Sequence, residues 1–145
     1  MAGKIRFYPE ECNSLNYEQR KERKEKLLRQ SVKYMYDHSP EYYQLRFKEC
    51  GATPSDIRTI EDLRKLPIFM DKDRERQSME ASLEKYGHPF GLHICCDPAD
   101  IISTGGTSGT TGHPTYPYSQ TREDREFIAD ATFFMHTLLG LGRGD

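Results

Sequence analysis

The stretch that decides the fold is T-G-G-T-S-G-T-T-G-H-P-T at residues 104–115. Its glycines allow the backbone to adopt positive φ and to turn several N–H groups to one side, and its hydroxyls add further donors. This composition indicates a loop that binds phosphate, with a merely flexible turn as the alternative. Neither common phosphate motif fits, because the lysine of G-x-x-x-x-G-K-[ST] and the spacing of G-x-G-x-x-G are both absent.

Short apolar runs on either side of this loop predict β-strands. Residues 92–96 and 101–104 precede the loop, and residues 115–119 follow it. We therefore expect the loop to join two strands as a long hairpin rather than to lead into a helix. Cys95 and Cys96 lie in the first run, where we expect buried packing rather than a reactive thiol, since the neighbouring Asp97 would raise a thiol pKa.

An amphipathic helix is predicted after the second side of the hairpin. Thr121 followed by Asp124 is typical of a helix start, and Gly140 is typical of a helix end. The apolar residues between them share one face, as in a helix that packs against other structure. These residues are Phe127, Ile128, Ala131, Phe134, Met135, Leu138 and Leu139.

The first part of the chain is predicted to form short helices. Capping residues and prolines place them at residues 17–37, 40–50, 59–66 and 71–86. Ser39, which precedes a proline, is expected to cap the second of them. The aromatic and apolar residues expected to pack that helix are Tyr42, Tyr43, Leu45 and Phe47.

Composition changes near residue 88. Residues 56–88 hold eight acidic and seven basic side chains, whereas residues 89–120 hold only Asp97 and Asp100 as charged side chains. We expect a helical N-terminal region at residues 1–88 and the start of an α/β domain at residues 89–145.

The charge balance and the cysteine pattern exclude several classes of function. With 21 Lys and Arg against 23 Asp and Glu, the net charge of −2 argues against a nucleic-acid binder held by positive charge. No apolar run is long enough to span a membrane, and residues 1–7 lack the core of a secretory signal, so we expect a cytoplasmic protein. Cysteines without a C-x-x-C pair, and histidines without i, i+4 spacing, indicate neither a disulfide framework nor a metal site.

The loop also resembles the signature of a known family. Its residues match [ST]-[ST]-G-T-T-G-x-P, the phosphate loop of the adenylate-forming superfamily of acyl- and aryl-CoA ligases, at Thr107, Ser108, Gly109, Thr110, Thr111, Gly112 and Pro114. Within that superfamily the chain looks most like the phenylacetate-CoA ligase group. Thr115 follows the proline as in that group, and S-P-E-Y-Y at residues 39–43 and the G…D-I…E-D-L…L-P spacing of residues 51–67 are similar to it. The resemblance covers about residues 30–145.

The resemblance implies an α/β fold, α+β at this length, in which N-terminal helices lead into the first strands and phosphate loop of an AMP-binding domain. It also implies a two-step reaction, in which a carboxylate attacks the α-phosphate of ATP and a CoA thiol then displaces AMP. ATP, Mg²⁺ and CoA would take part, with a small aromatic or aliphatic carboxylic acid as substrate; a carrier-protein thiol in place of CoA is left open. The residues implied to bind the phosphates are Thr107, Ser108, Gly109, Thr110, Thr111, Gly112 and His113.

Two features depart from the family pattern. His113 stands where relatives often carry lysine, so nucleotide affinity would depend on pH, and Gly105 and Gly106 replace the usual lead-in to the loop. The catalytic residues are expected beyond Asp145, which makes this chain an N-terminal fragment of a ligase that is inactive alone. The alternative is a truncated, noncatalytic module that binds nucleotide weakly or docks onto a partner through the apolar face of residues 127–139. The identity of the acid and the presence of a homodimer are left open.

Overall fold

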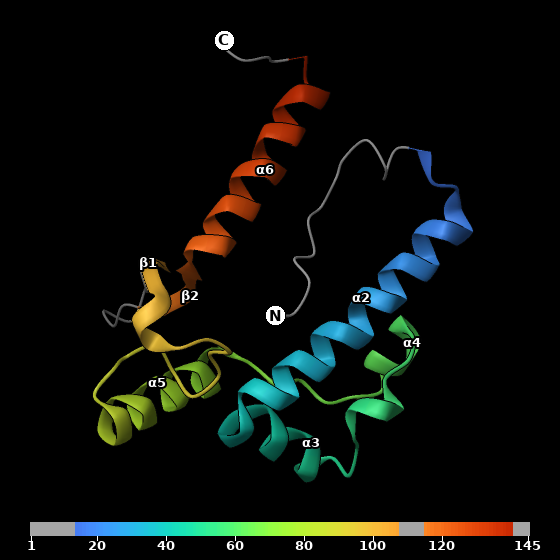
Figure 1. The fold of residues 1–145 in the computed structure, drawn as a ribbon. Coiled ribbons are helices and arrows are strands. Elements are labelled where there is room, and N and C mark those ends of the chain that lie inside the picture. The colour runs from blue at the N-terminus through green and yellow to red at the C-terminus, as the bar shows by residue number, and fades with distance from the viewer. Residues whose placement is uncertain (1–13, 108–114, 141–145) are drawn as a thin grey trace.

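The computed structural model describes residues 14–107 and 115–140, which form helices and one small sheet (Figure 1). In chain order the helices before the sheet are α2 (Tyr17–His38), the π-helix η1 (Pro40–Gln44), α3 (Leu45–Glu49), the 3-10 helix η2 (Pro54–Asp56), α4 (Ile60–Leu63), α5 (Lys72–Tyr86) and the 3-10 helix η3 (Pro98–Asp100). The strands β1 (Ile101–Thr107) and β2 (Thr115–Thr121) follow, and then helix α6 (Arg122–Leu138). This helix-rich chain with the first strands of a sheet confirms the predicted fold class, while the division after residue 88 stays a prediction.

Local capping explains where the helices begin. The Asn16 side chain accepts the Gln19 N–H at 3.0 Å, and the Gln19 side chain accepts the Asn16 N–H in return, which starts α2. Asp71 accepts the Arg74 N–H at 2.8 Å and starts α5, as the sequence predicts. These contacts satisfy N–H groups that have no partner within the helix.

The apolar core lies between α2, α3 and the segment that follows η2. Val32, Phe47 and Ile57 are buried there, and the Phe47 ring meets the rings of Tyr36 and Phe69 edge to face at 5.6 and 5.0 Å. Leu28 and Met35 of α2 pack partly buried around this cluster. The core therefore ties the helices to one another and leaves the hairpin at their edge.

The helix expected at residues 40–50 is confirmed as η1 followed directly by α3, with Ser39 at the N-cap position and Pro40 in the first turn. Two details of that prediction are wrong. Leu45, expected to pack the helix, is 44% exposed. Ser39 makes no capping hydrogen bond with its side chain. Its hydroxyl is buried and donates instead to the Leu92 carbonyl at 2.7 Å, because the distant segment around residue 92 packs against this corner.

The prediction of a strand at residues 92–96 is also wrong. Serine side chains bind backbone N–H and C=O groups of this segment that would otherwise pair with a neighbouring strand. Ser39 binds the Leu92 carbonyl, Ser78 accepts the Leu92 N–H at 2.8 Å, and Ser82 accepts the Gly91 N–H at 2.9 Å. All three serines are buried. The segment is therefore fastened to α2 and α5 by side chains rather than by a ladder.

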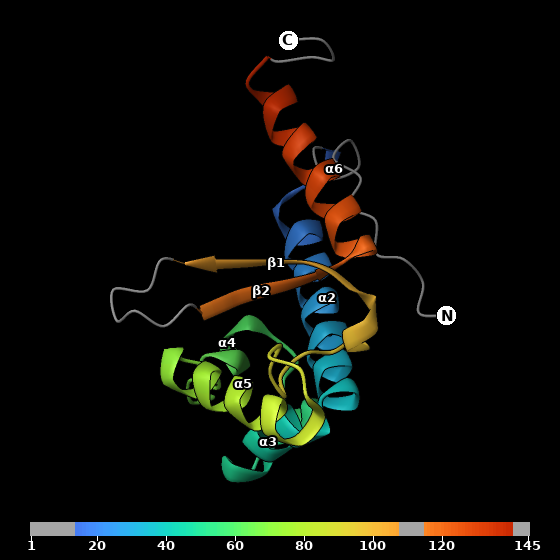
Figure 2. The same ribbon diagram turned by 90° about the vertical axis from the view of Figure 1, so that its left-hand side faces the viewer.

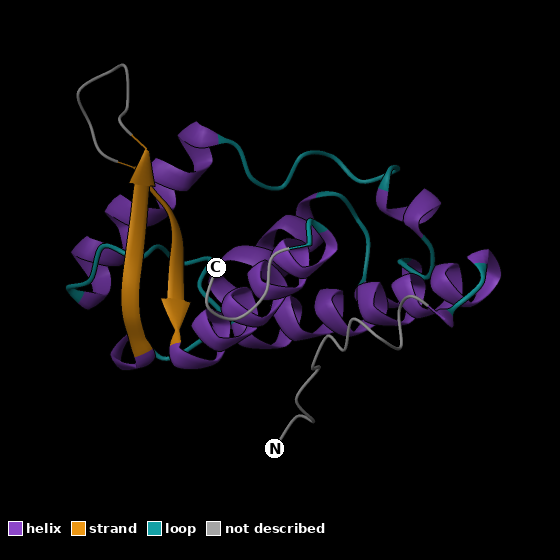
Figure 3. Ribbon diagram, turned by 90° about the horizontal axis from the view of Figure 1, so that it is seen from above, coloured by secondary structure: helices purple, strands orange, loops and turns teal. Residues whose placement is uncertain are grey.

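The hairpin and α6 complete the described chain. Figures 2 and 3 show β1 and β2 side by side, and the two strands pair antiparallel. Helix α6 begins directly after β2, where Thr121 donates its N–H and its hydroxyl to the Asp124 carboxylate, both at 2.8 Å. The predicted apolar face of α6 is largely exposed, with Met135 at 58% and Leu138 at 60%.

Candidate functional site

The candidate phosphate loop is carried by the paired ends of two strands. Thr107, the last residue of β1, lies opposite Thr115, the first residue of β2. This pairing confirms that the loop closes a hairpin. Of the predicted phosphate-binding residues, Thr107 is described only in its backbone, and Ser108, Gly109, Thr110, Thr111, Gly112 and His113 lie outside the described residues. Their contact with phosphate stays a prediction.

The register beside the loop is irregular. Gly105 pairs with Tyr118 and Thr107 pairs with Thr115. Between these two pairs β1 has one residue and β2 has two, which is a β-bulge in β2. The extra residue of β2 falls in the interval that contains Pro117. Proline has no N–H to give to a ladder and is tolerated at such a bulge, which explains how it can stand within β2.

Tyr118 of β2 lies opposite Gly105 of β1, and its ring covers the glycine. A Cβ atom at position 105 would overlap the far end of the Tyr118 ring, at Cζ and the hydroxyl oxygen. The absence of a side chain at Gly105 thus leaves the space that the ring occupies. Sequence reasoning noted the glycine but missed its aromatic partner; the signal was a strand glycine before the loop and a tyrosine shortly after it.

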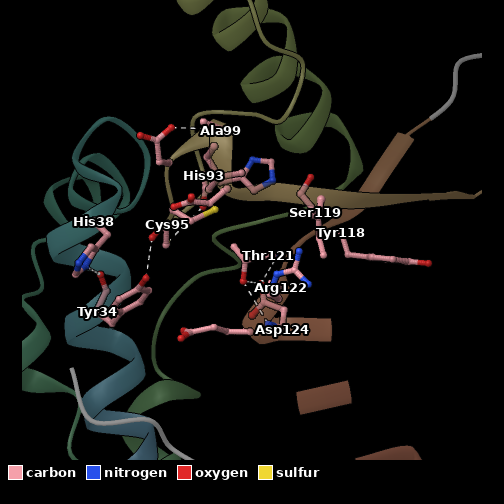
Figure 4. A pocket seen from close by; sticks show the side chains of 16 residues that line it. Tyr34, His38, His93, Cys95, Ala99, Tyr118, Ser119, Thr121, Arg122 and Asp124 are labelled. Carbon is pink, nitrogen blue, oxygen red and sulfur yellow. Dashed lines mark hydrogen bonds between the residues drawn. The ribbon is translucent and has the colours of Figure 1, made fainter. Parts of the chain in front are cut away.

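A cleft of about 850 Å³ lies at the base of the hairpin (Figure 4). Tyr34 and His38 of α2 line one side, and the start of α6 lines the other. The Tyr34 hydroxyl donates to the Cys95 carbonyl at 2.8 Å, which joins α2 to the segment before β1. The acidic side chains of the lining, Asp97, Asp100, Glu123 and Asp124, exceed its one guanidinium, Arg122. This negative lining is unfavourable for the binding of a triphosphate.

The two thiols at this cleft are poor nucleophiles. Burial, followed by the neighbouring Cys96, raises the pKa of Cys95 to about 11. Burial also raises the pKa of Cys96, with Asp124, Asp100 and Asp97 adding to the effect in that order. Both thiols therefore stay protonated near neutral pH. The expected direction is confirmed, although burial outweighs Asp97 as its cause.

His93 is held neutral in the same region. Its Nδ1 lies 2.9 Å from the Ser78 hydroxyl, which also accepts the Leu92 N–H, and its ring meets Tyr42 edge to face. Burial lowers the pKa of His93 because it disfavours the charged imidazolium. The neutral imidazole therefore shares a hydrogen bond with the Ser78 hydroxyl of α5.

Metal and membrane features can be stated for residues 14–107 and 115–140. Within these ranges no three His, Cys, Asp or Glu side chains come together to hold a metal ion. No helix in the same part of the chain has the length and apolarity needed to cross a bilayer. Magnesium in a nucleotide site is commonly held by substrate phosphates with few protein ligands, so the described residues do not need to form a metal cage.

Comparisons with known proteins point to one class of enzyme. No family model matches the chain. The chain is 39% identical over 88 residues to a phenylacetate-coenzyme A ligase of Pseudomonas putida, a match covering 61% of this chain and 17% of that protein. It is 28% identical over 124 residues to a phenylacetate-coenzyme A ligase of Thermus thermophilus, covering 86% of this chain and 25% of that protein.

Solved structures give the same result for the fold. A 2-hydroxyisobutyryl-CoA ligase in complex with 2-HIB-AMP and CoA matches 91% of this chain with a TM-score of 0.78 and 30% identity. The same enzyme in its postadenylation state matches 100% of this chain with a TM-score of 0.80 and 27% identity. The chain spans 26% and 28% of those two structures, about a quarter of their length.

Proposed function

On the premise that this chain belongs to the adenylate-forming superfamily, we propose that it supplies the phosphate-binding hairpin of a CoA ligase that activates a carboxylic acid as an acyl-adenylate. The observation that carries the proposal is the pairing of Thr107 with Thr115, which brings together the two ends of the T-S-G-T-T-G-H-P loop. Because the chain spans about a quarter of its relatives, the reaction is proposed for the enzyme to which this hairpin contributes.

In the proposed reaction a carboxylate oxygen attacks the α-phosphorus of ATP and pyrophosphate leaves. The CoA thiol then attacks the acyl carbon, loses its proton and expels AMP. Donors from the loop stabilise the charge that develops on the departing pyrophosphate. These donors are the backbone and side-chain groups of Thr107, Ser108, Gly109, Thr110, Thr111, Gly112 and His113. Mg²⁺ enters with the nucleotide and neutralises part of the phosphate charge.

The substrate is proposed to be a small aromatic or aliphatic carboxylic acid. The relatives that support this are named as phenylacetate-CoA and 2-hydroxyisobutyryl-CoA ligases, whose acids differ in size and aromatic character. A carrier-protein thiol is the alternative acceptor. The proposed location is the cytoplasm, where ATP and CoA are available.

A second candidate function is favoured by the exposure of α6. Its apolar side chains, with Ile128 at 45% and Leu138 at 60%, form a surface on which a partner protein could be held. In that function the chain is a noncatalytic module with weak nucleotide binding.

The test of the proposed function is ATP binding through the loop. In a calorimetric titration of the 145-residue chain with ATP and Mg²⁺, we expect Gly109→Val to abolish binding. Valine blocks positive φ and adds bulk where phosphate must approach the backbone. Ala129→Val, an exposed change on α6, is the control and should bind like the unsubstituted chain.

Two results would contradict these expectations. Equal ATP affinity in the Gly109→Val variant would remove the loop from the site. Pyrophosphate release with ATP, Mg²⁺ and phenylacetate is expected to be absent for the 145-residue chain alone, and its detection would show that the chain carries its own catalytic groups.

A further inference from the structure

The contact between Tyr118 and Gly105 occupies a particular place in the hairpin. It is the last directly opposed pair before the bulge, and the next pair is Thr107 with Thr115 at the ends of the loop. A change in the contact between residues 105 and 118 therefore affects the adjacent pair, which lies at the ends of the loop.

This place in the sheet is intrinsically weak. A two-stranded antiparallel sheet is marginal in water, and β1 and β2 are the whole sheet among the described residues. A glycine within a strand weakens pairing further, because it has greater backbone freedom and no side chain to pack across the sheet. An aromatic ring laid on the glycine from the opposite strand offsets this weakness, since it covers the bare backbone.

The ring also selects the register. It occupies the space where a Cβ atom at position 105 would stand, so its position requires glycine on the facing strand. A shift of the pairing toward Thr104 would bring the ring against a β-branched side chain. Because a one-residue shift also turns every side chain of a strand to the other face, the glycine and the ring together disfavour that shift.

We propose that Tyr118 is a positioning residue, which holds Thr107 opposite Thr115 through the contact of its ring with Gly105 and so presents the loop in one register. Tyr118 itself touches no substrate in this proposal. The inference rests on the proposed function for what the loop binds, but the register that Tyr118 maintains is a property of the hairpin and can be measured separately.

The experiment compares amide hydrogen exchange at residues 103–107 in the 145-residue chain by NMR. We expect Tyr118→Ala to raise these exchange rates by about two- to fivefold, the range that a cross-strand aromatic pair provides. Gly105→Ala should also raise them, because the added methyl group displaces the ring. Tyr118→Phe retains the ring and should exchange like the unsubstituted chain, and Ser119→Ala, the neighbouring change on β2, is the control.

A second measurement tests the positioning role. The affinity for ATP with Mg²⁺ should fall in Tyr118→Ala by about the same two- to fivefold factor and be restored in Tyr118→Phe. Amides of α2 around the buried Val32 report whether the core remains folded, so that a hairpin effect is separated from unfolding of the chain.

The outcomes separate the two proposals. Unchanged exchange in Tyr118→Ala overturns the inference, and so does faster exchange with unchanged ATP affinity. Faster exchange in a chain that binds no ATP before substitution overturns the proposed function instead, while it supports the role of Tyr118 in the register.

Discussion

At the scale of the residue, His93 shows how burial decides the chemistry of a side chain. Sequence reasoning treated the histidines together as poor candidates for a metal site, and it gave His93 no other role. In the fold, Ser78 and the ring of Tyr42 surround its imidazole, and burial lowers its pKa. A buried neutral histidine links stability to pH, because the unfolded chain accepts a proton that the folded chain resists.

This linkage gives a prediction. The folded pKa of His93 lies below its usual value of 6.5, so its contribution to stability is complete above that value and is lost as the pH falls below it. We expect the midpoint of thermal unfolding to decrease between about pH 7 and pH 5. His93→Asn, whose amide can donate to or accept from the Ser78 hydroxyl but does not titrate, should flatten this dependence.

The control for this measurement is His136→Gln, a change at an exposed position of α6. It should leave the pH dependence as it is in the unsubstituted chain. An identical slope in His93→Asn and in the unsubstituted chain would exclude His93 as its source.

At the scale of the element, the comparison of sequence and structure separates local from distant causes. The starts of α5 and α6 were predictable, because Asp71 and Thr121 meet partners three residues away. The hairpin was equally predictable, since the glycines and the flanking apolar runs lie within one stretch of sequence. The loop was expected to begin at residue 104, but β1 extends to Thr107. The segment at residues 92–96 was not, because Ser39 and Ser78 reach it from far along the chain. The cover that Tyr118 gives Gly105 was missed for a related reason, since it depends on the bulge that sets their register.

The serine contacts can be tested by removing one hydroxyl. Ser82 is fully buried, accepts the Gly91 N–H and donates to the His88 carbonyl at 2.8 Å. Ser82→Ala leaves both backbone groups without this partner, and we expect it to reduce the free energy of unfolding by about 1 to 3 kcal/mol. Urea denaturation measures this change.

Ser55→Ala provides the comparison, because Ser55 is exposed and its change should stay within about 0.5 kcal/mol. A loss of less than that in Ser82→Ala would mean that the segment is held by its apolar packing rather than by the serine hydroxyls.

At the scale of the whole molecule, the apolar surface is unevenly distributed. The core around Val32 and Phe47 is buried, whereas α6 rises from the hairpin with Met135 and Leu138 more than half exposed (Figure 1). Large apolar surfaces of this kind favour association. We expect the 145-residue chain to gain apparent mass with concentration, and Leu138→Glu to lower that gain.

Light scattering after size-exclusion chromatography measures this association. Ala129→Glu places the same charge on the opposite side of α6 and should leave the concentration dependence unchanged. If the unsubstituted chain kept a constant monomer mass at every concentration, the exposed face of α6 would not drive association.

The junction of the hairpin with α6 has a mechanical consequence. Thr121 is the last residue of β2, and its hydroxyl also begins α6 by bonding to Asp124, so the two elements share a residue with no linker between them. A helix joined directly to a strand passes its rotation on to that strand. A partner protein that bound α6 and rotated it would therefore turn β2 with it, and the motion would reach Thr115 at the far end of β2.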